Sequence, residues 1–283
     1  KTNPQRIVFA EGESQRVINA VQILVDDGIC KSILIGDPAN IQRNINAYGL
    51  RLNIGKDIEV VDPRNNANYQ KHVDEYSAVM CRKGVTPAYA RRVMTSRTTQ
   101  LAAIMVRCGD AEAMICGVEG NFISHLHYVR DLIGARPGLH DLAAVTMLIL
   151  KKGTYFLTDT HVGIDPSAEQ LADNTALAAE LVKGFGMEPK AALLSHSNFG
   201  SRMTEYSEKS RKALQILREK HPDLLVEGEM HADAALSQEI RDRLFKNSAF
   251  TGEANLLVCP DLDAANIAYN MTKMLADGLP VGP

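Results

Sequence analysis

The sequence has no tryptophan, few aromatic residues and no strong excess of charge of either sign. Aromatic residues make up 5% of the 283 residues, and 31 basic against 34 acidic residues give a formal net charge of −3. A chain this close to neutral has no field that would draw it to nucleic acid or to an anionic membrane. We therefore expect neither nucleic acid nor membrane among its partners.

Long apolar runs and paired cysteines are also missing. No run approaches the length of a membrane-spanning helix, and the N-terminus lacks the layout of a signal peptide. The five cysteines are scattered without a C-x-x-C pair, which indicates neither a disulfide framework nor a cysteine zinc site. Reduced thiols fit a cytoplasmic protein. Because the chain begins at Lys1 without an initiator methionine and stops at Pro283, we expect a fragment of a longer protein.

What the sequence does contain is an alternation of short apolar runs with longer helical patterns. The runs are mostly apolar along their length rather than alternating, as in parallel strands that helices cover on both faces. This predicts an α/β fold with mainly parallel sheets. A turn signal at Arg136-Pro137-Gly138 favours a domain boundary there, which divides the chain into residues 1–139 and 140–283. The expected strands are 7–10, 32–35, 58–61, 113–117, 155–160, 191–195, 224–229 and 255–259.

Polar residues that directly follow a strand are the first candidates for a site, because parallel sheets bind ligands at the carboxyl ends of their strands. One such loop is rich in hydroxyls and glycine, and its hydroxyls and backbone N–H groups could hold phosphate oxygens. An ordinary βα loop with serine caps is the alternative, and residue types alone favour it. The candidate residues of this loop are Ser195, Ser197, Asn198, Gly200 and Ser201.

Two carboxylates also follow expected strands. Asp159 is placed either to orient a ligand or to cap the helix that begins near Ser167. Asp261 follows the strand 255–259 and opens the last long helix. We weigh the two roles of Asp159 evenly.

Arginines and histidines give two further hypotheses. Arg130 and Arg136 suit a phosphate-bearing ligand, since a guanidinium forks onto phosphate oxygens, although surface ion pairs are the default for any arginine. The nearby His125-x-His127 lacks a third spaced ligand. Glu229, His231 and Asp233 could share one face of a strand and bind a metal, but a strand end followed by a capped helix is the preferred interpretation. We expect no metal in this chain.

Taken in order, segments along nearly the whole chain resemble the phosphate acetyltransferase family. The segment 193–201, Leu-Leu-Ser-His-Ser-Asn-Phe-Gly-Ser, is similar to the family's "LSFSTKGS", and 165–172 is similar to its "PTAEQLA" helix start. Each match alone is modest, but their common order is specific. The other matching segments are 7–12, 113–117, 227–236, 254–262 and 266–269.

This resemblance implies a fold of two α/β domains, a cleft for acetyl-CoA and phosphate, and a homodimer. It also implies that Asn266, within the last matching segment, belongs to the ligand site together with Asp159, Asp261 and the serine loop. The match is incomplete where the family carries cations. Phe199 stands at a family lysine and Met274 at a family arginine, so we expect very little acetyl transfer from this chain.

The sequences of segments 193–201 and 227–236 resemble those of a subgroup, the C-terminal domain of large NADP-dependent malic enzymes. That resemblance implies a regulatory domain that binds acetyl-CoA, within a protein that forms a higher homo-oligomer. It also implies that NADP and a divalent metal bind in a malic enzyme half, which converts malate to pyruvate. The alternatives are an active phosphate acetyltransferase and a structural dimerisation module with a vestigial cleft.

Overall fold

The structure is a computed structural model that describes residues 3–139 and 142–282. The chain divides into two compact units, Lys1–Gly134 (unit 1) and Ala135–Pro283 (unit 2). The boundary expected between residues 139 and 140 falls on residue 140, which lies outside the described residues.

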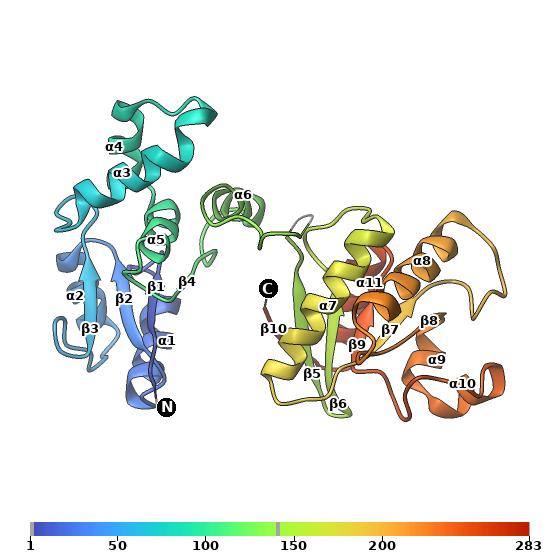
Figure 1. Ribbon diagram of the computed structural model, residues 1–283. Helices are drawn as coiled ribbons and strands as arrows, with labels where there is room; N and C mark the ends of the chain where they lie inside the picture. Colours follow the sequence, from blue (N-terminus) through green and yellow to red (C-terminus); the bar gives the residue numbers. More distant parts are fainter. Residues whose placement is uncertain (1–2, 140–141, 283) are drawn as a thin grey trace. The chain divides into compact units, whose positions relative to one another are not determined.

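Unit 1 is built on a four-stranded parallel sheet of order β3-β2-β1-β4 (Figure 1). Successive residues of its strands point to opposite faces, so Val8 and Ile33 pack with one group of helices and Phe9 and Leu34 with another. This explains why these strands are mostly apolar and do not alternate between apolar and polar residues. The elements are β1 (Arg6–Phe9), α1 (Gln15–Asp26), β2 (Lys31–Ile35), α2 (Pro38–Ala47), β3 (Ile58–Val61), α3 (Tyr69–Met80), η1 (Cys81–Lys83), α4 (Pro87–Ser96), α5 (Thr98–Arg107), β4 (Ala113–Ile115) and α6 (Phe122–Leu132).

Unit 2 contains a six-stranded sheet of order β10-β5-β6-β9-β7-β8 (Figure 1). The four strands β6, β9, β7 and β8 are mutually parallel, whereas β5 runs antiparallel to both β6 and β10. The elements are β5 (Val145–Leu150), β6 (Gly153–Thr158), α7 (Ala168–Gly184), β7 (Lys190–Leu194), α8 (Glu205–Lys220), β8 (Leu225–Met230), α9 (Ala232–Leu236), α10 (Gln238–Leu244), β9 (Leu256–Val258), α11 (Leu262–Leu275) and β10 (Leu279–Val281).

The core of unit 2 lies on both faces of this sheet. Phe156 and Leu193 pack against α7 and α8 on one face, while Leu157 and Met230 pack with Tyr269 of α11 on the other. Burial of side chains of this size contributes about 1.5–3 kcal/mol each. Local signals fix where the helices begin: Ser167 and Gln170 form a capping box at α7.

The expected α/β class with mainly parallel sheets is confirmed, and each expected strand occurs with ends within two residues of the expected positions. The sequence does not predict β5 or β10. Strand β5 is joined to β6 by Lys151 and Lys152 alone, a hairpin that an α/β pattern does not call for. Strand β10 is three exposed residues long and contains Pro280, which an edge strand tolerates.

Candidate functional site

Four neighbouring loops of unit 2 lie together where the parallel strands of its sheet end, along the carboxyl edge of the sheet. Because β6, β9, β7 and β8 are parallel neighbours, their carboxyl ends lie together, and adjacent strands are about 4.8 Å apart. The loops carry Asp159 after β6, Asp261 after β9, Ser195–Ser201 after β7 and His231 after β8. We call this set of loops, with Asn266 of α11, the edge site.

The serine loop, residues 195–201, is held mainly by its own groups and by β8. The Ser197 hydroxyl is fully buried and donates to Glu229 Oε1 at 2.7 Å, and the Gly200 N–H donates to the same oxygen at 2.8 Å. The Ser195 and Ser201 hydroxyls accept from the backbone N–H groups of Ser197 and Asn198. The loop is therefore preformed, and its hydroxyls take part in its internal structure.

Asn198 ties the serine loop to the next strand. Its side-chain oxygen accepts the N–H of His231 at 2.8 Å, and the His231 ring bonds the carbonyl of His196 at 2.9 Å. The His196 ring in turn lies 3.2 Å from the Thr204 hydroxyl, and Thr204 caps α8. The start of α8 is thus capped by its own residues.

Asp159 builds the loop that contains it. Its carboxylate accepts the backbone N–H groups of His161, Val162 and Gly163 at 2.8–3.0 Å, and the residue is only 5% exposed. The second role considered for Asp159, capping the helix near Ser167, is filled instead by Ser167 and Gln170. Asp159 would therefore affect a bound ligand indirectly, by fixing the conformation of residues 161–163.

Asp261 and Asn266 join this loop to α11. The Asp261 carboxylate accepts the N–H of Ala264 and so caps the helix. One helical turn later, the Asn266 side-chain amide donates to the Thr160 carbonyl at 3.2 Å. Asp261 and Asn266 thus both lie at the edge site, where their side chains bond backbone groups of α11 and of the loop after β6.

Two lysines at the edge site were missed by the sequence reasoning. Lys209 of α8 donates to Asp165 at 2.6 Å and to the Pro260 carbonyl at 2.9 Å, which links the loops after β6 and β9. Lys273 of α11 lies 4.8 Å over the Tyr269 ring. Both lie inside helices, where only helical register and tertiary packing bring them to the edge. They bring two cations to the edge site, beside the loops after β6 and β9.

His161 lies among these groups. Burial lowers the pKa of its imidazole, and the Lys273 charge lowers it further, while the Asp159 charge acts in the opposite direction. Its ring also contacts the Thr160 hydroxyl at 2.8 Å and lies 6.1 Å from the Tyr269 ring.

We expect the stability of unit 2 to fall on the acid side because of His161. With a folded-state pKa below the ordinary value of about 6.5, protonation favours the unfolded chain. The stabilisation is complete above that ordinary value and is lost as the pH falls through it toward the folded pKa. Melting temperatures of the wild type and of His161→Asn between pH 8 and pH 5 measure this. The variant should lose less stability in acid, and parallel curves would contradict the assignment.

Arg136 and His125, two of the residues proposed from the sequence, have local partners. Arg136 pairs with Glu180 of α7 at 2.8 Å on the surface of unit 2, and Arg130 belongs to α6 of unit 1. His125 bonds the Thr99 hydroxyl and the Glu119 carbonyl. Arg136 is thus engaged on the surface of unit 2, whereas Arg130 and His125 belong to unit 1.

The described part of the chain does not bring three metal-binding side chains together. Glu229 points into the serine loop, His231 bonds a carbonyl, and Asp233 lies in the first turn of α9. The strand end is thus followed by a helix, as expected, but no side chain caps the start of that helix. Within the described residues, no helix is long and apolar enough to cross a membrane.

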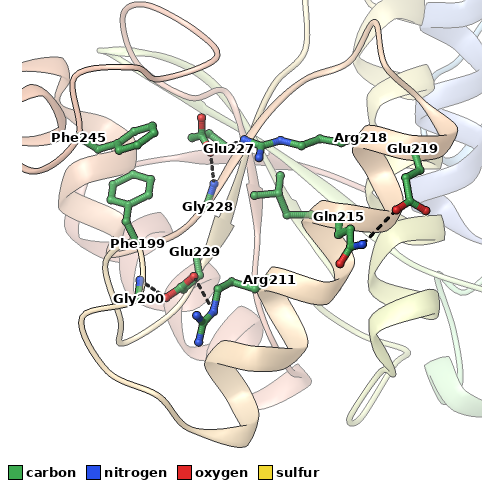
Figure 2. A pocket seen from close by; sticks show the side chains of 11 residues that line it. Phe199, Gly200, Arg211, Gln215, Arg218, Glu219, Glu227, Gly228, Glu229 and Phe245 are labelled. Atoms are coloured by element: carbon green, nitrogen blue, oxygen red, sulfur yellow. Dashed lines mark hydrogen bonds and ion pairs between the residues drawn. The ribbon is translucent and has the colours of Figure 1, made fainter.

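The two positions where the resemblance implies lost cations have different surroundings. Phe199 packs its ring on Phe245, with centroids 4.7 Å apart, and its backbone is left-handed with φ of 48° (Figure 2). A non-glycine residue in that region stores about 1–2 kcal/mol. Met274 is 73% exposed on α11. At residue 199, therefore, an apolar contact occupies the place where a charge is expected.

Comparisons with known proteins agree with this geometry. The family model described as "Phosphate acetyl/butaryl transferase" matches residues 1–283. A solved phosphotransacetylase from Streptococcus pyogenes superposes with a TM-score of 0.90 and 28% identity, over 99% of this chain and 84% of that one.

Two malic enzymes are more similar in sequence. The chain is 48% identical over 278 residues to the NAD-dependent malic enzyme of Rhizobium meliloti (strain 1021), covering 98% of this chain and 36% of that protein. It is 44% identical over 281 residues to the NADP-dependent malic enzyme of Escherichia coli (strain K12), covering 99% of this chain and 37% of that protein. The chain thus spans little more than a third of the length of these relatives.

Proposed function

The chain belongs to the phosphate acetyl/butaryl transferase family, and on this basis we propose that it is the acetyl-CoA-binding regulatory domain of a malic enzyme. The observation that carries the proposal is the whole-chain match to malic enzymes at 44–48% identity, against 28% for the solved phosphotransacetylase. In this proposal the nicotinamide coenzyme, a divalent metal and the oxidation of malate belong to the remainder of the longer protein.

The chemistry of the edge site supports binding more than acetyl transfer. Attack of phosphate on a thioester needs cations for the incoming anion and for the oxyanion. Phe199 fills its position with an apolar stack, and the Ser197 hydroxyl donates to a carboxylate. The acetyl-CoA ligand would lie against the outer surface of the serine loop, with Lys209 and Lys273 as cations of the same edge site.

A thermal shift titration tests this function. Bound acetyl-CoA should raise the melting temperature, because a ligand at 100 times its Kd stabilises by about 2.7 kcal/mol. An unchanged melting temperature at millimolar acetyl-CoA would refute the proposal. CoA without an acetyl group, run in parallel, reports how much of the shift depends on the acetyl group.

The second candidate is an active phosphate acetyltransferase, which the close superposition on a phosphotransacetylase favours. Incubation with acetyl-CoA and phosphate, followed by an assay for acetyl phosphate, separates the two. Clear turnover would replace the regulatory proposal by the enzymatic one.

The third candidate is a dimerisation module of a cytoplasmic malic enzyme. It is favoured by an apolar strip on α11, where Ile267, Met271 and Met274 are each more than half exposed at helical spacing. Analytical ultracentrifugation with and without acetyl-CoA tests it. A dimer that gives no thermal shift would favour this candidate over the regulatory one.

A further inference from the structure

A pocket of about 430 Å³ lies beside the serine loop, between α8 and β8 (Figure 2). Two carboxylates of β8 and two arginines of α8 line this pocket. The arginines are seven residues apart and so share one face of the helix. The charged residues concerned are Glu227 and Glu229 of β8, and Arg211 and Arg218 of α8.

The two ion pairs look equivalent in composition. Glu229 is fully buried and lies 3.4 Å from Arg211 Nε, and Glu227 is 2% exposed and accepts from Arg218 at 2.9 Å. Both couple the same helix to the same strand. Each pair therefore serves as a control for the other.

Only Glu229 touches the serine loop. Its Oε1 accepts from the Ser197 hydroxyl and the Gly200 N–H, and its backbone carbonyl accepts the N–H of Phe199 at 2.8 Å. Glu227 instead accepts from the N–H groups of Gly228 and Ala249, outside that loop.

The Glu229–Arg211 pair is also incompletely bonded. Both Glu229 Oε2 and Arg211 Nε are buried without a hydrogen-bond partner, although the two charges lie close together. Each charge therefore depends on the other for compensation in a desolvated place. Removing Arg211 leaves the buried Glu229 carboxylate without its counter-ion, and removing the Glu229 charge leaves Arg211, which is 33% exposed, unpaired beside the loop.

We infer that Glu229 is the positioning residue of the serine loop, with Arg211 as the counter-ion that keeps its carboxylate in place. The inference rests on the proposed function, since the loop is the part of the edge site that would meet acetyl-CoA. In this inference, the Glu229 carboxylate stabilises the left-handed turn at Phe199 and Gly200, where φ is 48° and 88°. It predicts that the order of the loop and ligand affinity change together.

The test compares Glu229→Gln with Glu227→Gln in the full chain. Hydrogen exchange of residues 195–204 and the Kd for acetyl-CoA by calorimetry are the two readouts. We expect Glu229→Gln to speed exchange in the loop and raise Kd by about tenfold, through the unpaired Arg211 charge. Glu227→Gln should lower the melting temperature similarly and leave both readouts unchanged. Equal effects of the two variants on the readouts would overturn the inference.

Two further variants keep the test decisive. If Glu229→Gln does not fold, Arg211→Gln against Arg218→Gln repeats the comparison, because both arginines are partly exposed. In the double variant Glu229→Gln with Arg211→Gln, no charge is left unpaired, and loop exchange should return toward the wild type. A wild type that ignores acetyl-CoA refutes the proposed function alone, because exchange in the loop still decides the inference.

Discussion

Replacing Asp159 by alanine should destabilise unit 2 by about 3 kcal/mol and abolish acetyl-CoA binding. The carboxylate accepts the N–H groups of His161, Val162 and Gly163, and the residue is 5% exposed. A buried donor left without a partner costs about 1–3 kcal/mol, part of which the loop recovers by opening to water. Opening displaces the carbonyl of Thr160, to which Asn266 donates. Urea unfolding and calorimetry with acetyl-CoA measure the two effects.

Two controls separate this role from a general loss of charge. Asp159→Asn keeps one acceptor oxygen, so it should lose about half as much stability as the alanine variant. Asp165→Asn removes an exposed carboxylate from the same loop, where the pair with Lys209 contributes at most about 1 kcal/mol. An Asp159→Ala protein as stable as Asp165→Asn would show that the loop does not depend on this carboxylate.

Replacing Arg241 by methionine should cost unit 2 about 4 kcal/mol, the largest effect we expect on stability. This arginine is fully buried, and its guanidinium donates to the carbonyls of Ala234, Phe250 and Gly252. It also lies 4.6 Å from the centroid of the Phe250 ring. Methionine fills a similar volume but leaves these carbonyls without donors. Urea unfolding of the variant gives the free energy directly.

The neighbouring Arg243 provides a matched control for Arg241. It belongs to the same helix, α10, but is 72% exposed and pairs with Glu239 one turn away. Arg243→Met should therefore change the unfolding free energy by less than about 0.5 kcal/mol. Losses of equal size in the two variants would contradict the role assigned to the buried guanidinium.

Arg241 also marks a limit of sequence reasoning. It belongs to the segment Gln-Glu-Ile-Arg-Asp-Arg-Leu, where Arg241 and Arg243 look alike as members of a charged surface helix. Their difference arises from residues 234, 250 and 252, which supply carbonyl groups to Arg241 alone. These acceptors are backbone carbonyls, which every residue has. The residue types of a sequence therefore do not indicate which carbonyls will meet a buried arginine.

The serine loop shows the same limit at the site. Its residue types left open whether its hydroxyls and N–H groups face a ligand or form an ordinary βα loop, and favoured the latter. In the fold, Ser197 donates to Glu229, which is 32 residues away on the neighbouring strand β8. Pairing between β7 and β8 creates this contact, and strand pairing is a property of the sheet order. The loop's place at the carboxyl edge was predictable, but the direction of its hydroxyls was not.

The family, the α/β class and most of the strands could be predicted before the structure was known. These features depend on local residue pattern and on segment order, both of which are present in the chain before it folds. Tertiary structure alone decided that Asp159 shapes its loop, that Lys209 and Lys273 reach the edge site and that Arg241 is buried. Each depends on backbone groups or helices brought together from distant parts of the chain, and such contacts leave no mark on the types of neighbouring residues.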